Sequence, residues 1–251
     1  MTVTKGTGFG ARRGLMMALV ALLLVTACAR PPVPADGHDP FEATNRIRFE
    51  GNLALSRAIL GDSAEAPARD GPAPLRRMVR NFGANLGAPA TVANDLLQLR
   101  PDRAVGNTLR FVVNSTIGLA GLFDPATAIG LPGRHSDFGE TLHRWGMGEG
   151  AYVVLPVLGP STERDMLGMV VDAVIDPWGF VATRHEARAV TAARWAGRVA
   201  EMGEYADLLD ANVIRTADPY AQARLLFLQT RRYHLGIETE DDFIDPYAFL
   251  D

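Results

Sequence analysis

The chain has 251 residues, of which 47% are hydrophobic, and a formal net charge of −4 at pH 7. This acidic balance argues against a protein that binds nucleic acid through phosphate contacts and against a polybasic patch for lipid headgroups. A single cysteine excludes an intramolecular disulfide and a thiolate metal site. The length predicts one domain, or two closely packed ones, and the apolar fraction fits either a large core or a surface that faces lipid.

The first 27 residues have the features of a signal peptide. A basic start without acids, made by Lys5, Arg12 and Arg13, precedes an apolar run that is too short for a stable membrane span. The run closes on Val25-Thr26-Ala27-Cys28, which resembles the bacterial lipobox. We therefore expect cleavage after residue 27, a mature charge of −7 and lipid attachment to Cys28. The alternative is an ordinary signal peptide followed by a buried cysteine.

The residue after Cys28 indicates where such a lipoprotein goes. In Gram-negative bacteria an aspartate there usually retains a lipoprotein in the inner membrane, whereas this chain has Ala29. By that resemblance we expect an outer-membrane protein, lipid-anchored at the periplasmic face and inner leaflet. The proline-rich residues 28–38 are expected to form a short extended tether.

From Asp39 onward the sequence predicts helices separated by glycine-rich joints. Asp39-Pro40 begins a helix over 39–60. Helical spacing of apolar residues predicts a second helix over 75–86, which Gly87 and Pro89 are expected to end. Further helices are predicted over 91–99, 102–121, 160–175, 183–215 and 219–235. The whole indicates an all-α fold, with one helical domain over 39–236 and an acidic tail over 237–251.

The stretch that follows the 102–121 helix is too apolar for a common surface loop. Its large apolar residues are Leu119, Leu122, Phe123, Ile129 and Leu131. Two interpretations stay open on these residues alone. The stretch is either a loop folded back on the core or a hairpin that enters a membrane interface.

No arrangement of residues predicts catalysis or metal binding. The five histidines lie too far apart for a two-histidine helix site. The run His135-Ser136-Asp137 does not predict a triad, because the three groups of a triad converge from separate elements. Gly146-x-Gly148-x-Gly150 lacks the spacing of a nucleotide-binding loop and predicts tight backbone turns. We therefore expect no catalytic residue, metal or cofactor, and a protein that acts through its shape.

Polar and glycine-containing blocks follow one another in a defined order from Asp39 to about Tyr233. They are Asp39-Pro40-x-Glu42 with Asn45-Arg46, Asn81-Phe82-x-x-Asn85-Leu86, Asn94-x-x-Leu97-Gln98, Arg110-Phe111-x-x-Asn114, Asp137-Phe138-Gly139-x-Thr141-Leu142, Trp145-Gly146-x-Gly148-x-Gly150, Arg164-Asp165 with Gly168, and Asp218-Pro219-Tyr220. Together these blocks resemble the MlaA/VacJ family of outer-membrane lipoproteins.

The resemblance implies a ring-like single helical domain in the inner leaflet of the outer membrane, with an amphipathic channel through its middle. Family members take phospholipid that has strayed to the outer leaflet and pass it to a soluble periplasmic carrier, in association with trimeric porins and without covalent chemistry. On this basis the 117–132 stretch is the interfacial hairpin. The alternative function is a scaffold lipoprotein that ties porins or envelope proteins together without moving lipid.

A headgroup that crosses hydrocarbon needs polar groups along its path. Candidates for lining such a channel or contacting lipid are Asn81, Asn85, Asn94, Asn114, Arg164 and Asp165. The alternative for Asn85 and Asn114 is that they only bond the backbone at helix ends and joints. Asp39, Asn45 and Arg46 are expected to lock the first helix to the ring.

Overall fold

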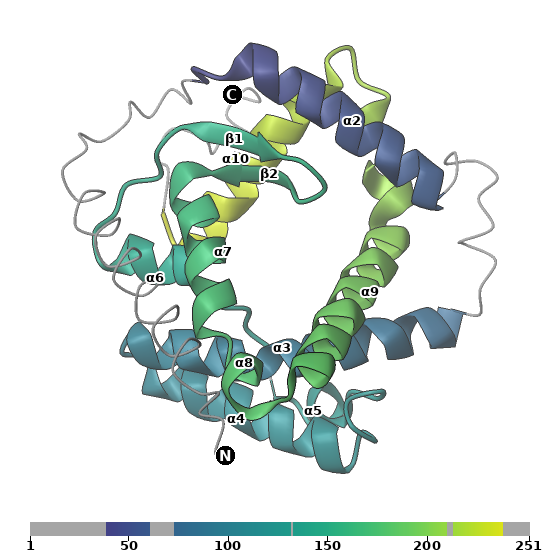
Figure 1. Ribbon diagram of the computed structural model, residues 1–251, viewed down its shortest axis with the longest axis vertical. Coiled ribbons are helices and arrows are strands. Elements are labelled where there is room, and N and C mark those ends of the chain that lie inside the picture. Colours follow the sequence, from purple (N-terminus) through teal and green to yellow (C-terminus); the bar gives the residue numbers. More distant parts are fainter. Residues whose placement is uncertain (1–38, 61–72, 132, 210–212, 238–251) are drawn as a thin grey trace, which may run out of the picture.

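The computed structural model describes residues 39–60, 73–131, 133–209 and 213–237. The predicted signal peptide, Cys28, the tether and nearly all of the acidic tail lie outside these residues. Figure 1 shows the described elements arranged around a ring. They are α2 (Glu42–Leu60), α3 (Ala73–Leu97), α4 (Pro101–Thr116), α5 (Pro125–Ala128), α6 (Phe138–Arg144), β1 (Tyr152–Leu155), β2 (Gly159–Thr162), α7 (Glu163–Ile175), α8 (Trp178–Val181), α9 (Arg184–Leu209) and α10 (Pro219–Leu235).

The helix starts and stops follow ordinary capping chemistry. The Thr162 side chain accepts a hydrogen bond from the backbone N–H of Asp165, which caps α7. Asp218 caps α10 in the same way, and Gly236, with a φ of 72°, ends that helix in the left-handed conformation. The predictions for these two helices and for most of α2 are therefore confirmed.

The predicted break at Gly87 and Pro89 is wrong, because α3 runs through both residues without interruption. A proline inside a helix displaces carbonyl groups of the preceding turn. One of these carbonyls, that of Leu86, accepts a hydrogen bond of 2.7 Å from the indole N–H of Trp178. Tertiary contact thus supplies a donor beside the proline, which a sequence pattern could not indicate.

The predicted all-α fold is confirmed, and the described residues add to it one small antiparallel hairpin. Strand β1 pairs with β2 so that Tyr152 lies opposite Thr162. The free edge of β1 bonds to α2, since the Asn45 side chain donates to the carbonyl of Tyr152 and accepts from the N–H of Val154. Asn45 therefore takes the place of a third strand. The turns predicted before this hairpin are confirmed by the positive φ of Gly146 and Gly150.

The buried apolar residues form two small clusters rather than one large core. The first contains Tyr152, Val154, Tyr220 and Leu228, and the second contains Phe138, Leu142 and Val171. Buried polar side chains are at least as prominent among the described residues, which is unusual because polar groups are mostly exposed in folded proteins. No described helix combines the length and apolarity needed to cross a membrane.

Helices α6 and α7 cross at two glycines. A Cβ atom on Gly168 would lie 2.4 Å from the backbone nitrogen of Gly139 and 2.7 Å from its Cα. No side chain fits into that space, so the two backbones approach as closely as atoms permit. This contact sets the position of α6 against α7 and of the polar residues that both helices carry.

We predict that Gly168→Ala destabilises the protein by about 2 kcal/mol, because overpacking a close contact costs about 1–3 kcal/mol. Urea unfolding of the protein in detergent, followed by circular dichroism, measures the change. Gly106→Ala in α4 is the matched control, since a Cβ there meets no atom within 4 Å. Equal stability of the two variants would contradict the close-contact argument.

Candidate functional site

Helix α4 has its polar side buried and its apolar side exposed. Asn107 and Asn114 lie on the buried face with Ala104. Val105, Leu109 and Val112 are exposed to 60%, 47% and 48%. These three residues follow the i, i+4, i+7 spacing of one helix face. The helix is therefore amphipathic in the opposite sense to a helix on the surface of a water-soluble protein.

The second half of α3 has the same inverted pattern. Asn94, Asp95 and Gln98 are almost completely buried around its C-terminal end. Leu96 is exposed, and Leu99, in the turn between α3 and α4, is exposed to 87%. A contiguous exposed apolar surface of this kind marks contact with a membrane or another protein. The α3–α4 pair thus presents apolar side chains outward and holds polar ones inside.

The predicted interfacial hairpin continues this pattern while also folding back on α4. Leu119, Phe123 and Ile129 are exposed, whereas Leu122 and Leu131 are half-buried. The segment is held by Asp124, which accepts two hydrogen bonds from Arg110 at 3.1 and 3.0 Å. The structure therefore combines features of both sequence interpretations, and entry into a membrane interface stays a prediction.

Asp124 remains ionised in this position. Burial alone would raise its pKa, but hydrogen bonds from Thr127 and Asn114 and the charge of Arg110 outweigh burial and lower it. Asn114 donates to Asp124 at 3.0 Å and accepts the backbone N–H of Ala126. Asn114 thus bonds a helix terminus, as the alternative interpretation of the sequence expected.

A polar pocket of about 210 Å³ lies between α3, α4 and the 124–135 segment. Three of the six predicted channel residues, Asn81, Asn85 and Asn114, are in its lining. The other lining residues are Ala84, Ala88, Thr91, Asn107, Arg110, Phe111, Asp124, Gly133, Arg134 and His135. The pocket is the candidate site that unites the inward-facing polar residues of α3 and α4.

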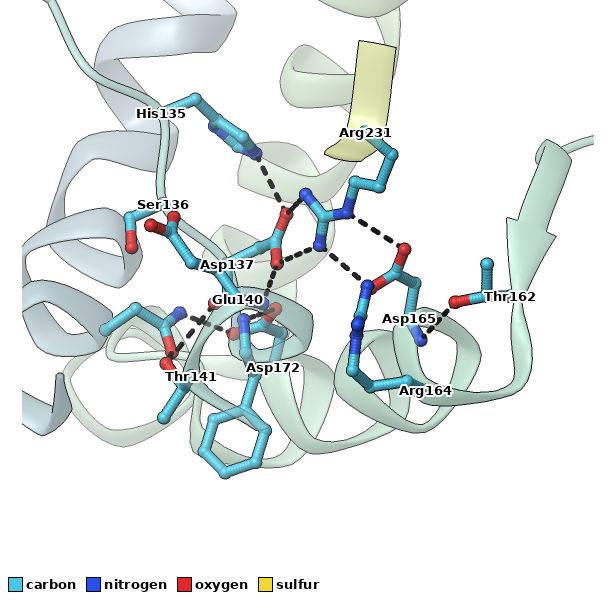
Figure 2. A network of polar contacts seen from close by, with 12 residues as sticks. His135, Ser136, Asp137, Glu140, Thr141, Thr162, Arg164, Asp165, Asp172 and Arg231 are labelled. Atoms are coloured by element: carbon cyan, nitrogen blue, oxygen red, sulfur yellow. Dashed lines mark hydrogen bonds and ion pairs between the residues drawn. The ribbon is translucent and has the colours of Figure 1, made fainter. Parts of the chain in front are cut away.

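Arg164 and Asp165 belong to a network of polar contacts centred on Arg231 of α10 (Figure 2), and Asn94 lies beside it. The guanidinium donates to both oxygens of Asp137 at 2.9 and 2.8 Å and to both oxygens of Asp165 at 2.9 Å. Asp137 is also the N-cap of α6, and Asp165 lies in the first turn of α7. Arg231 therefore joins three helices. Burial lowers the pKa of its guanidinium, but the hydrogen bonds and charges of the two carboxylates outweigh burial and leave the pKa above the usual range.

Asn94 and Arg164 are fully buried. Asn94 donates to Asp172 at 2.8 Å and accepts from the Thr141 hydroxyl at 3.0 Å. Burial raises the pKa of Asp172. The Nε of Arg164 donates to Asp165 at 3.2 Å, whereas its Nη2 has no hydrogen-bond partner in the described part of the chain. These contacts hold the helices together. A role of these residues in lipid contact stays a prediction.

The first helix is fastened by the residues expected to lock it. Asn45 donates to Asp39 at 2.9 Å, and Arg46 donates to both oxygens of Asp218 at 3.0 and 2.8 Å. The Tyr220 hydroxyl also donates to Asp39. These bonds join the start of α2 to the start of α10. Arg231 was not among the predicted site residues, because no local pattern distinguishes it from other charged residues on helices. Asp218 is recognisable from the sequence only as part of a family block at a helix start, and its bond to Arg46 is a tertiary contact.

The described residues offer little for covalent chemistry. Ser136 is buried and its hydroxyl accepts a hydrogen bond of 2.7 Å from Gln98, while His135 lies 3.8 Å from Asp137. Within the described ranges no group of three histidine, cysteine or acidic residues is arranged to hold a metal ion. The arrangement can bind and position polar groups.

We predict that Arg231→Met lowers the free energy of unfolding by about 3 kcal/mol, because removing one partner of a buried ion pair leaves the other charge uncompensated. Asp137 loses its arginine partner, and Asp165 keeps only Arg164. Thermal unfolding in detergent measures the loss, and Arg188→Met, at an exposed position on α9, is the control. A melting temperature equal to that of the control would refute the fastening role.

A model of the MlaA lipoprotein family matches residues 37–234. A Rickettsia felis protein is 37% identical over 134 residues, which is 53% of each chain, so the match spans about half of that relative. The intermembrane phospholipid transport system lipoprotein MlaA of Escherichia coli is 30% identical over 220 residues, 85% of this chain and 84% of the relative. That of Haemophilus influenzae is 28% identical over 239 residues, 88% and 90% of the two chains.

A solved structure gives the same result at the level of the fold. It comes from a study of the structural basis for maintenance of bacterial outer membrane lipid asymmetry, and it superposes with a TM-score of 0.63 at 30% identity. The superposition covers 79% of this chain and 99% of the other. The family match, the relatives and the fold agree, and the chain belongs to the MlaA lipoprotein family.

Proposed function

We propose that this protein removes mislocalised phospholipid from the outer leaflet of the outer membrane through an amphipathic channel and passes it to a periplasmic carrier. It thereby maintains lipid asymmetry and is not an enzyme. The E. coli and H. influenzae relatives are named for intermembrane phospholipid transport, and the superposed structure concerns outer-membrane lipid asymmetry.

The observation that carries the proposal is the inverted amphipathic pattern of α3 and α4, which bury their polar side chains and expose their apolar ones. In water, exposed leucine and valine side chains are unfavourable and buried asparagines are costly unless they are bonded. In hydrocarbon the outward leucines and valines match their surroundings, and the inward polar groups offer the only polar path. An apolar exterior around a polar interior is the composition that a headgroup-conducting body in lipid requires.

The size of α4 supports a location within one leaflet. Its 16 residues span about 24 Å at 1.5 Å per residue. The hydrocarbon core of a bilayer is about 30 Å thick. A helix of this length that exposes Val105, Leu109 and Val112 suits contact with the acyl chains of a leaflet better than a complete crossing.

The anchor and the partners complete the proposal. Diacylglycerol on Cys28 would hold the body at the periplasmic face of the outer membrane, since multiple acyl chains give stable anchoring. A trimeric porin beside the ring and a soluble carrier below it are the expected protein partners. Phospholipid is the expected cargo, and nucleic acid is not a partner.

We predict that the purified lipoprotein, reconstituted in vesicles with its periplasmic carrier, transfers labelled phospholipid to the carrier. Heat-unfolded protein should give only the spontaneous rate. The scaffold alternative predicts porin binding without transfer, so that result would overturn the proposal. Transfer should also survive Ser161→Ala, and its loss there would instead indicate a hydrolase that uses this serine.

We predict that Cys28→Ala leaves an uncleaved precursor that no longer reaches the outer membrane, because lipidation precedes cleavage and sorting in bacterial lipoproteins. Membrane fractionation with detection by antibody measures its location. Wild-type protein in the same cells is the control. Recovery of the variant in the outer-membrane fraction at the wild-type level would show that the lipid does not direct sorting.

A further inference from the structure

The pocket between α3, α4, Asp124 and residues 133–135 is too small for an acyl chain. Its volume of about 210 Å³ lies below the range of about 300–1,000 Å³ that is typical of sites for drug-sized ligands. Asparagine, arginine and aspartate side chains contribute most of its large lining residues. Its dimensions and lining suit a small polar group.

One cation in the lining is available for a ligand. Arg110 is already committed, because it donates to Asp124, to the Thr127 hydroxyl and to the carbonyl of Leu131. The Arg134 side chain is exposed and makes no hydrogen bond or ion pair with any described residue. Arg110 and Asp124 neutralise each other, so among the described lining residues the Arg134 guanidinium is the cation left to attract an anion.

Two acceptor oxygens complement that cation. The Nδ2 of Asn107 donates to Asp95 at 2.7 Å and to the backbone carbonyl of Arg134 at 3.0 Å, which fixes the orientation of the amide. The Nδ2 of Asn85 donates to the Ser115 hydroxyl at 2.9 Å and to the carbonyl of Ala120 at 3.3 Å. Within the described residues the Oδ1 atoms of Asn85 and Asn107 accept no hydrogen bond, and both residues line the pocket.

We propose that this pocket binds a phospholipid headgroup whose phosphate is followed by a hydrogen-bond donor, such as ethanolamine or glycerol. The phosphate binds Arg134, and the ammonium or hydroxyl groups donate to the oxygens of Asn85 and Asn107. Choline fits poorly because its quaternary nitrogen carries no N–H to donate. This inference rests on the proposed transport function and adds to it a headgroup preference located at named atoms.

The test measures binding of water-soluble headgroups to the full-length lipoprotein in detergent by calorimetry. The probes are glycerophosphoethanolamine, glycerophosphoglycerol, glycerophosphocholine and inorganic phosphate. We expect the first two to bind about tenfold more tightly than the choline compound, which is the upper end of the effect of losing one ordinary hydrogen bond. Arg134→Gln should weaken both by about tenfold, and Arg134→Lys should recover part of the loss.

Arg144→Gln, at an exposed arginine outside the pocket lining, is the matched control and should bind like the wild type. Equal binding of the choline compound, or no effect of Arg134→Gln, overturns the proposal. Inorganic phosphate that binds as tightly as the headgroups overturns it too, because the site would then recognise phosphate alone. If the wild type transfers phospholipid between vesicles and carrier without headgroup preference, the transport function stands and the proposed headgroup site is wrong. If the protein binds headgroups but transfers no phospholipid, the site stands and the transport function is wrong.

Discussion

Aspartates that cap helices also bind arginines from other elements, and the ring depends on these contacts. A carboxylate has two oxygens with several lone pairs, so it can accept the backbone N–H groups at a helix start and a guanidinium at the same time. The pairs, with the capped helix in each case, are Asp124–Arg110 at α5, Asp137–Arg231 at α6 and Asp218–Arg46 at α10. Each pair fixes where a helix begins and which distant segment it touches.

This way of holding the fold together explains why the apolar clusters are small. Charged hydrogen bonds, together with Asn45 at the edge of β1 and the glycine contact between α6 and α7, position the elements without a large apolar interior. Leucine and valine side chains are thereby free to occupy the outer faces of α3 and α4. A body built in this way is suited to hydrocarbon outside and polar groups inside.

Sequence patterns predicted what depends on neighbours in the chain. Pro219 after Asp218 and Gly236 after Leu235 mark the ends of α10 correctly, because caps and stops are local chemistry. Passage of α3 through Pro89 could not be predicted, since it involves Trp178, which is distant in sequence. Arg231 was missed for the same reason. Asn81, Asn85 and Asn114 were predicted as a group and share one pocket, yet nothing local separated them from Asn94, which bonds Asp172 instead.

The lowered pKa values of the cap aspartates also make the ring tolerant of acid. A guanidinium stays protonated at any physiological pH, so these contacts fail only when the aspartate takes up a proton. Hydrogen bonds from Arg46 lower the pKa of Asp218 to about 2, and the pKa values of Asp124 and Asp137 also lie below the ordinary value. Asp95 and Asp172, whose pKa values burial raises, take up protons first, and neither belongs to the three aspartate–arginine pairs. When the pH around the protein falls, the buried Asp95 and Asp172 are therefore protonated before the aspartate–arginine contacts at the helix starts are lost.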